Sequence, residues 1–155
     1  MTHKLSFQFL SQPTDVNFGG KVHGGAVMKW MDQTAFACAS QWASSYCVTV
    51  YVGGIRFYQP IKIGDLVKID AHVIYTGETS IHVALNVYSR KVSETEFIKT
   101  THCIMVFVSL DEQGKPQKVK KWEPRSDEDK QLQEYAIKLM DLRKMIESEM
   151  TPFYQ

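Results

Sequence analysis

The sequence has no run of about 18 apolar residues, so it predicts no membrane-spanning helix. The formal net charge is only +1, which gives no general attraction for nucleic acid or for an anionic membrane surface. Residues 1–4 lead directly into an alternating segment and show no apolar stretch of a signal peptide. These absences favour a cytoplasmic protein whose partners are neither nucleic acid nor a membrane.

Cysteine is scarce, and the three cysteines show no spacing typical of a zinc site or a disulfide framework. Cys38, Cys47 and Cys103 lie among apolar residues, so we expect them to be buried and reduced. The histidines of the predicted strands likewise lack ligand spacing. We therefore expect no metal and no redox cofactor.

The 155 residues are 44% hydrophobic and 23% charged, as expected of one globular domain. Residues 4–10 alternate as a half-buried strand, and a long apolar helix covers about residues 26–43. From residue 47 the hydrophobic period changes to two, for four strands of roughly ten residues that end near residue 110. Gly53-Gly54 interrupts the first of these, which indicates a bulge or a close approach. Because short turns join these strands, we expect an antiparallel sheet. The apolar helix must be covered, and the sheet is the element available to cover it. We predict an α+β fold with a curved sheet wrapped round the helix.

The last part of the chain differs in composition. A basic linker begins near residue 118, and Ser126 followed by three acidic residues is typical of a helix start. Apolar residues then recur at helical spacing: Leu132, Tyr135, Ala136, Leu139, Leu142 and Ile146. We predict a main domain at 1–117, and an extra amphipathic C-terminal helix within 118–155 that packs on this domain or on a neighbouring subunit.

The long helix is apolar nearly all round, so we expect it to be buried. One face is expected to carry Val27, Trp30, Met31, Thr34, Ala35, Cys38 and Trp42. Asp32 lies at the edge of this face, where a carboxylate needs a partner, a proton or a chemical role. A hydrogen-bonded structural carboxylate is the alternative interpretation.

Gly24 and Gly25 open this helix, where the first backbone amides point outward and carry partial positive charge. Glycine leaves these amides accessible, although tight packing would also explain the pair. At 1.5 Å per residue, Asp32 lies roughly 12 Å along the axis from Gly24. Both groups act on one atom most simply if a second copy of the chain contributes one of them, so the geometry favours a dimer.

Residues 17–25, Asn-Phe-Gly-Gly-Lys-Val-His-Gly-Gly, and the pair Met31-Asp32 resemble the hotdog-fold acyl-CoA thioesterases. The closest resemblance is to the YciA-like and brain-type (BACH-like) acyl-CoA hydrolases. Further matching stretches are residues 48–50, 57–65 and 79–81, and the resemblance covers about residues 5–117. It implies the hotdog fold and an acyl-CoA substrate in fatty acid metabolism. It also implies a homodimer with one continuous sheet, often assembled as a hexamer, a trimer of dimers.

The resemblance also implies roles for individual residues. Asp32 matches the helix carboxylate that acts as general base or nucleophile. Asn17 matches the loop asparagine that orients water or the thioester across the dimer interface. Gly24 or Gly25 matches the backbone amide that binds the thioester oxygen. No cofactor is implied beyond the coenzyme A of the substrate and product.

Coenzyme A needs partners for its phosphates. The candidates for substrate and coenzyme A binding are His23, Gly54, Arg56, Thr79, Ser80, Arg90 and Lys91. Each charged residue among them is also compatible with a solvated surface position.

We expect an acyl-CoA thioesterase, and two alternatives stay open. A hydratase or dehydratase on the same fold needs an Asp/His pair, for which His23 is the only nearby histidine. A non-catalytic acyl-CoA-binding sensor or interaction module would keep the fold without the chemistry.

Overall fold

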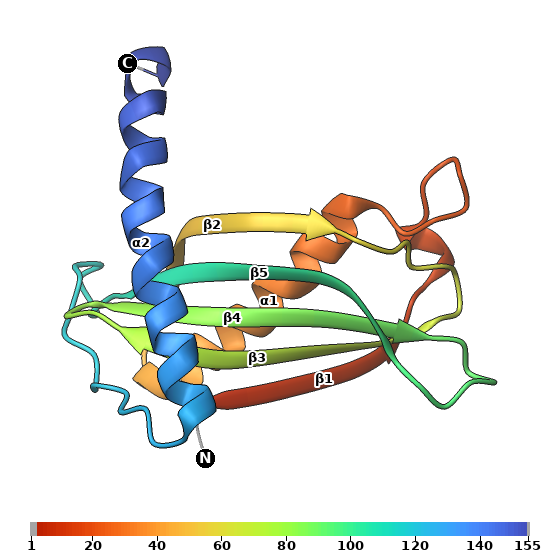
Figure 1. Ribbon diagram of the computed structural model, residues 1–155, viewed down its shortest axis with the longest axis horizontal. Coiled ribbons are helices and arrows are strands. Elements are labelled where there is room, and N and C mark those ends of the chain that lie inside the picture. The colour runs from red at the N-terminus through yellow and green to blue at the C-terminus, as the bar shows by residue number, and fades with distance from the viewer. Residues whose placement is uncertain (1–2, 155) are drawn as a thin grey trace.

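The computed structural model describes residues 3–154. The elements are β1 (Lys4–Leu10), the 3-10 turn η1 (Pro13–Asp15), α1 (Gly24–Ala43), β2 (Cys47–Phe57), β3 (Leu66–Thr76), β4 (Ser80–Arg90), β5 (Ile98–Ser109) and α2 (Asp127–Tyr154). The strands form one antiparallel sheet in the order β1-β3-β4-β5-β2. Helix α1 covers one face of this sheet and α2 crosses the other (Figure 1). The predicted α+β fold is confirmed.

Helix α1 is buried on one face only. Val27, Met31 and Ala35 lie in the main core against the sheet, and the helix ends where Ser44 adopts a left-handed conformation with φ 54°. The predicted buried face is confirmed except at the half-buried Trp30, whereas Met28 and Phe36 on another side of the helix remain 41% and 36% exposed. In the single chain these two residues and the half-buried Asp32 between them form an open side of α1.

Strand irregularities occur where β2 and β3 bend. The register shifts between Gly53 and Arg56, and Gly54 has φ +66°, so the predicted interruption is a bulge. A second register shift lies between Val73 and Tyr75. Simple alternation predicts Tyr75 on the face of Val73, which is wrong because the bulge turns Tyr75 toward the cluster beneath α2.

Helix α2 begins as the sequence predicts, with the Asp129 backbone N–H donating to Ser126 Oγ at 3.0 Å. Its first half packs on the outer sheet face, where Ala136 is buried beside Ile74 and Ile104. The Tyr135 hydroxyl and His102 Nε2 lie 2.8 Å apart and tie the helix to β5. The second half of α2 extends past β2 and leaves the sheet behind (Figure 1).

Strand β2 is a free edge of the sheet. It is 11 residues long, and Val50 and Val52 on it are 54% and 40% exposed. A long edge strand with exposed apolar side chains offers unpaired backbone groups to another chain. None of the helices described between residues 3 and 154 is long and apolar enough to cross a membrane.

Candidate active site

Asp32 projects from the middle of α1 toward β2. The hydroxyl of Thr49 on β2 donates a hydrogen bond of 2.7 Å to Asp32 Oδ1. Within residues 3–154, Asp32 Oδ2 has no hydrogen-bond partner. The carboxylate is therefore oriented through one oxygen and free to accept a proton through the other.

Sequence reasoning missed the role of Thr49 and placed it only inside a matching stretch. The sequence did hold a signal for this contact. Cys47 and Thr49 are two residues apart in a strand and so point to the same face, and Cys47 lies in the core against α1. A polar residue on that face needs a polar partner, and Asp32 is such a partner on the helix.

Apolar side chains surround this carboxylate. Met28 and Phe36 lie one turn before and after Asp32, and the Phe36 ring meets the Tyr46 ring edge-on at 5.9 Å. Tyr46 is itself 62% exposed. On the open side of α1, Met28 and Phe36 thus flank one carboxylate, with the exposed Lys29 beside them. This surface suits a ligand with an apolar group and one reacting polar centre.

The N-terminus of α1 lies next to a cavity. Gly24 faces the ring of Phe57, where a Cβ would come within 3.4 Å of the ring, whereas a Cβ at Gly25 would meet nothing within 4 Å. A cavity of about 370 Å³ opens here between Gly24, Phe57 and Pro60. A Cβ at position 24 would thus make a close contact with the Phe57 ring, whereas position 25 has open space among residues 3–154.

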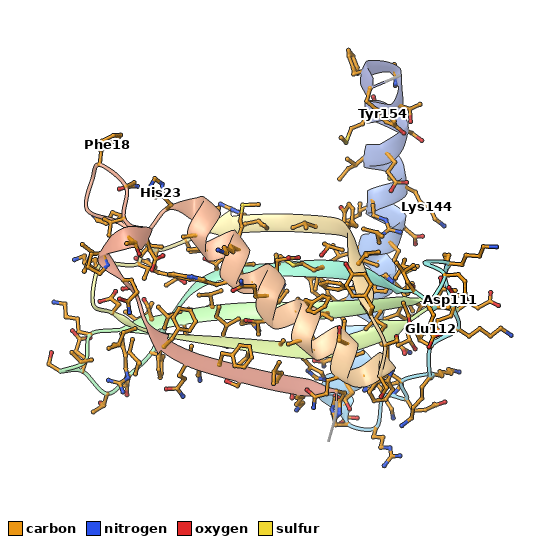
Figure 2. All side chains as sticks on the ribbon, turned by 180° about the vertical axis from the view of Figure 1, so that it is seen from behind. Phe18, His23, Asp111, Glu112, Lys144 and Tyr154 are labelled. Carbon is orange, nitrogen blue, oxygen red and sulfur yellow. The ribbon has the colours of Figure 1, made fainter. Side chains whose placement is uncertain are left out.

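The loop before α1 is shaped by Asn17. Its side-chain Oδ1 accepts hydrogen bonds from the backbone N–H groups of Gly19 at 2.9 Å and Lys21 at 3.2 Å. Since both bonds use the oxygen, the amide nitrogen of Asn17 remains a free donor within the described chain. The next residue, Phe18, is fully exposed at the tip of the loop (Figure 2).

The structure brings Asp32 and Thr49 together but does not bring Asn17 to Asp32. The loop of Asn17 lies before the first turn of α1, whereas Asp32 lies two turns inside it. His23 is exposed at the N-cap, and its side chain makes no capping bond. The single chain therefore does not form a site that contains both Asn17 and Asp32.

The candidates for coenzyme A binding are scattered. Arg56 pairs in register with His102, whose ring contacts Tyr135 of α2, so Arg56 lies on the sheet face away from α1. Its guanidinium lies over the Tyr58 ring at 5.2 Å. Gly54 lines a cavity on that same face.

Two further pairs of candidates lie at opposite ends of β4. Thr79 and Ser80 precede or begin the strand, with Ser80 Oγ 3.4 Å from His82 Nε2. Arg90 and Lys91 follow roughly 33 Å away, at about 3.3 Å per residue. Arg90 donates to the carbonyls of Lys91, Val92 and Glu94 and so shapes the next turn. One chain cannot bring both pairs to the same phosphate.

Comparison with known proteins decides the family. The profile of the thioesterase superfamily matches residues 19–96, which include the start of α1, Asp32 and Thr49. The chain belongs to the thioesterase superfamily. Acyl-CoA thioester hydrolase YciA of Salmonella typhimurium is 33% identical to this thioesterase over 116 residues, which are 73% of this chain and 87% of the relative.

Solved structures agree with this assignment. An apo-hexameric acyl-CoA thioesterase superposes with a TM-score of 0.87 and 32% identity. The match covers 92% of this chain and 91% of the chain of that structure. The acyl-CoA hydrolase of Staphylococcus aureus, solved with butyryl coenzyme A, superposes with a TM-score of 0.88 and 29% identity. The match covers 97% of this chain and 93% of the chain of that structure.

The Staphylococcus aureus hydrolase has also been solved with alanine in place of an asparagine, an aspartate or a threonine. Those three positions are separated by 15 and then 17 residues, as are Asn17, Asp32 and Thr49 in this thioesterase. The same three residue types thus recur at the same spacing.

Proposed function

We propose that this thioesterase hydrolyses acyl-CoA thioesters to a free acid and coenzyme A. The observation that carries the proposal is the Asp32 carboxylate on the open side of α1, which Thr49 orients through one oxygen. Its other oxygen has no hydrogen-bond partner among residues 3–154. Its relatives named as acyl-CoA hydrolases support the substrate class.

Hydrolysis needs a base, a nucleophilic water and an oxyanion site. Asp32 takes a proton from water, and the water oxygen forms a bond to the thioester carbonyl carbon. The carbonyl oxygen becomes an oxyanion that accepts a hydrogen bond from the backbone N–H of Gly25, with Gly24 beside it. The C–S bond then breaks, and the coenzyme A sulfur leaves as a thiolate that takes up the proton. The open space at Gly25 supports this assignment.

Asn17 acts in this scheme only as a donor. Because its Oδ1 already accepts two backbone N–H groups, its amide nitrogen is the atom left to bind substrate or water. A donor stabilises an oxygen lone pair, so Asn17 binds either the thioester oxygen or the attacking water.

The site is completed by a homodimer. Pairing of two β2 edges makes one continuous sheet and lets the Asn17 loop of one copy reach the α1 helix of the other. The free, apolar β2 edge and the exposed Phe18 support this arrangement. The hexameric relatives are consistent with dimers as a building unit, and a trimer of dimers is the assembly we propose.

The reaction is tested by release of free thiol from a panel of short, long and aryl acyl-CoAs, with wild type and Asp32→Asn side by side. We expect fast release by wild type and loss in the variant, with coenzyme A binding retained. Tight acyl-CoA binding without thiol release would contradict hydrolysis and support a sensor function instead. Hydration of an enoyl-CoA without thiol release would replace it by hydratase chemistry.

A further inference from the structure

Helix α2 carries one continuous stripe whose residues alternate in steps of four and three. The stripe consists of Leu132, Ala136, Leu139, Arg143, Ile146, Met150 and Phe153. Steps of this kind keep side chains on one face of a helix. All of these residues except Arg143 are apolar, so a single apolar face runs nearly the whole length of the helix.

Among residues 3–154, the first half of this stripe packs on the sheet, whereas most of the second half is exposed. Leu132, Ala136 and Leu139 pack on the outer face of the sheet. Ile146, Met150 and Phe153 are 52%, 55% and 90% exposed. This second half beyond Arg143, which we call the arm (residues 144–154), keeps only Ile146 beside the sheet among residues 3–154, at a cavity that Tyr51 also lines.

The stripe passes from packed to exposed where α2 crosses β2, the free edge of the sheet. At this point the Arg143 guanidinium lies over the Tyr51 ring of β2 at 4.8 Å. Beyond it the arm continues on the far side of β2 (Figures 1 and 2). The face of α2 that packs on its own sheet therefore stays apolar past the end of that sheet.

We propose that the arm docks on the outer sheet face of a second copy of this chain. The inference rests on the β2-to-β2 dimer of the proposed function, because such a dimer continues the sheet beneath the arm. By two-fold symmetry each copy gives an arm and receives one. The receiving surface is the outer face of the second copy's β2 and its neighbour β5.

The receiving surface has a suitable shape and chemistry. A cavity on the outer face lies between the chain's own α2, at Leu139 and Ile146, and the strand residues Tyr51, Gly54 and Val106. A Cβ at Gly54 would meet nothing within 4 Å. An apolar side chain of the incoming arm can fill this space. The two arms then lie close together and antiparallel, since each crosses its own β2 near Tyr51.

The charges of the arm favour a second copy over a lipid surface. The residues off the stripe include Lys144, Glu147 and Glu149, which give no excess of positive charge. Amphipathic helices that bind anionic membranes are rich in lysine and arginine on the polar face. A protein surface that completes the sheet is therefore the occupant we infer.

The first test needs no variant. Hydrogen exchange of the wild-type chain is measured at a dilution where it is monomeric and at a concentration where it is assembled. We expect the amides of residues 144–154 to exchange fast in the monomer and to be protected in the assembly, because a short helix without packing is marginal in water. Equal exchange in both samples, or a chain that stays monomeric throughout, overturns the proposal.

The second test is sedimentation over a concentration series with the double variant Met150→Glu, Phe153→Glu. Ser148→Glu is the matched control, because Ser148 is exposed on the same arm but lies on the opposite side of α2 from the stripe. We expect the midpoint for assembly of the double variant to rise by at least about tenfold, since two buried apolar side chains are lost, and that of the control to stay unchanged. Unchanged assembly of the double variant contradicts the proposal.

Failure of this proposal and failure of the proposed reaction are distinguishable. Asp32→Asn should lose thiol release but keep the wild-type mass, and it reports on the reaction alone. If wild type releases thiol while the double variant assembles normally, only the arm is wrong. If the arm behaves as expected but no thiol is released, only the reaction is wrong.

Discussion

Thr49 on β2 and Asp32 on α1 are joined by a hydrogen bond of 2.7 Å from the Thr49 hydroxyl to Asp32 Oδ1. This contact links the central helix to the edge strand at which we place the dimer interface. It fixes the direction of a carboxylate that would otherwise rotate on the open side of α1. In the proposed dimer, the position of the proposed base therefore depends on the strand at which the two copies pair.

Replacement of Thr49 by valine keeps the shape of the side chain but removes the donor to Asp32. A hydrogen bond to a charged group contributes roughly 1.5–3 kcal/mol, so kcat/KM should fall by about 10-fold to 100-fold. Thr49→Ser keeps the hydroxyl and should stay within a few-fold of wild type. Equal thiol release by Thr49→Val and wild type would show that the contact does not serve catalysis.

Asn17→Asp separates the two functions of the asparagine side chain. The aspartate still offers an oxygen to the N–H groups of Gly19 and Lys21 but loses the amide donor. Loss of one preorganised donor should lower kcat by at least about 10²-fold. The variant should melt like wild type, and if it also hydrolyses like wild type, Asn17 only shapes its loop.

Gly25→Ala should move stability and activity in opposite directions. Its new methyl group meets nothing within 4 Å among residues 3–154. Alanine is favoured over glycine by roughly 0.5–1 kcal/mol in a helix interior, and by less at Gly25 in the first turn. The same methyl group enters the space assigned to the thioester oxygen, so activity should fall. Thermal melting and thiol release test both effects, and full activity in Gly25→Leu would remove Gly25 from the site.

Stability should fall on acidification because of His82. Burial, with a smaller effect of the Arg143 guanidinium, lowers the pKa of His82 from 6.5 to about 4. Below pH 6.5 the His82 imidazole is protonated in the unfolded chain but stays neutral in the folded chain. His82 therefore disfavours the folded state increasingly as the pH falls toward 4. From pH 7 to 4.5 this amounts to about 2 kcal/mol.

The measurement is urea unfolding of wild type and His82→Gln at both pH values. The loss of stability on acidification should be smaller by about 2 kcal/mol in the variant. His72, whose pKa burial also lowers to about 4, remains in both proteins and accounts for part of the loss that persists. An identical loss in the two proteins would contradict the role of His82.

Most of the fold can be predicted from the sequence because hydrophobic periods of two and 3.6 residues specify the strands and helices directly. Strand β1 and the start of α2 at Ser126 agree with the pattern. Tyr75 does not, because a single extra residue in a strand moves every later side chain to the opposite face. The exposed Met28 and Phe36 could not be foreseen, since their hydrophobicity does not say whether a chain covers itself or a partner.

The site divides in the same way. Asp32 could be selected because a carboxylate in an apolar helix is unusual, but Thr49 depends on which strand lies beside that helix. The expected phosphate ligands could not be placed from the sequence, because proximity to a motif does not reveal at which end or on which face of the sheet a side chain lies. Arg56 and Arg90 illustrate both cases.

The central claim is that each site uses Asp32 of one chain and Asn17 of another, and mixing of inactive subunits tests it most directly. Asp32→Asn and Asn17→Asp chains are unfolded together at equal amounts and refolded, with each variant refolded alone as control. Random pairing makes half of the dimers mixed, and each of these has one intact site. We therefore predict recovery of about a quarter of wild-type thiol release. A mixture no more active than the sum of its two components, with mixed dimers present, would contradict the shared site.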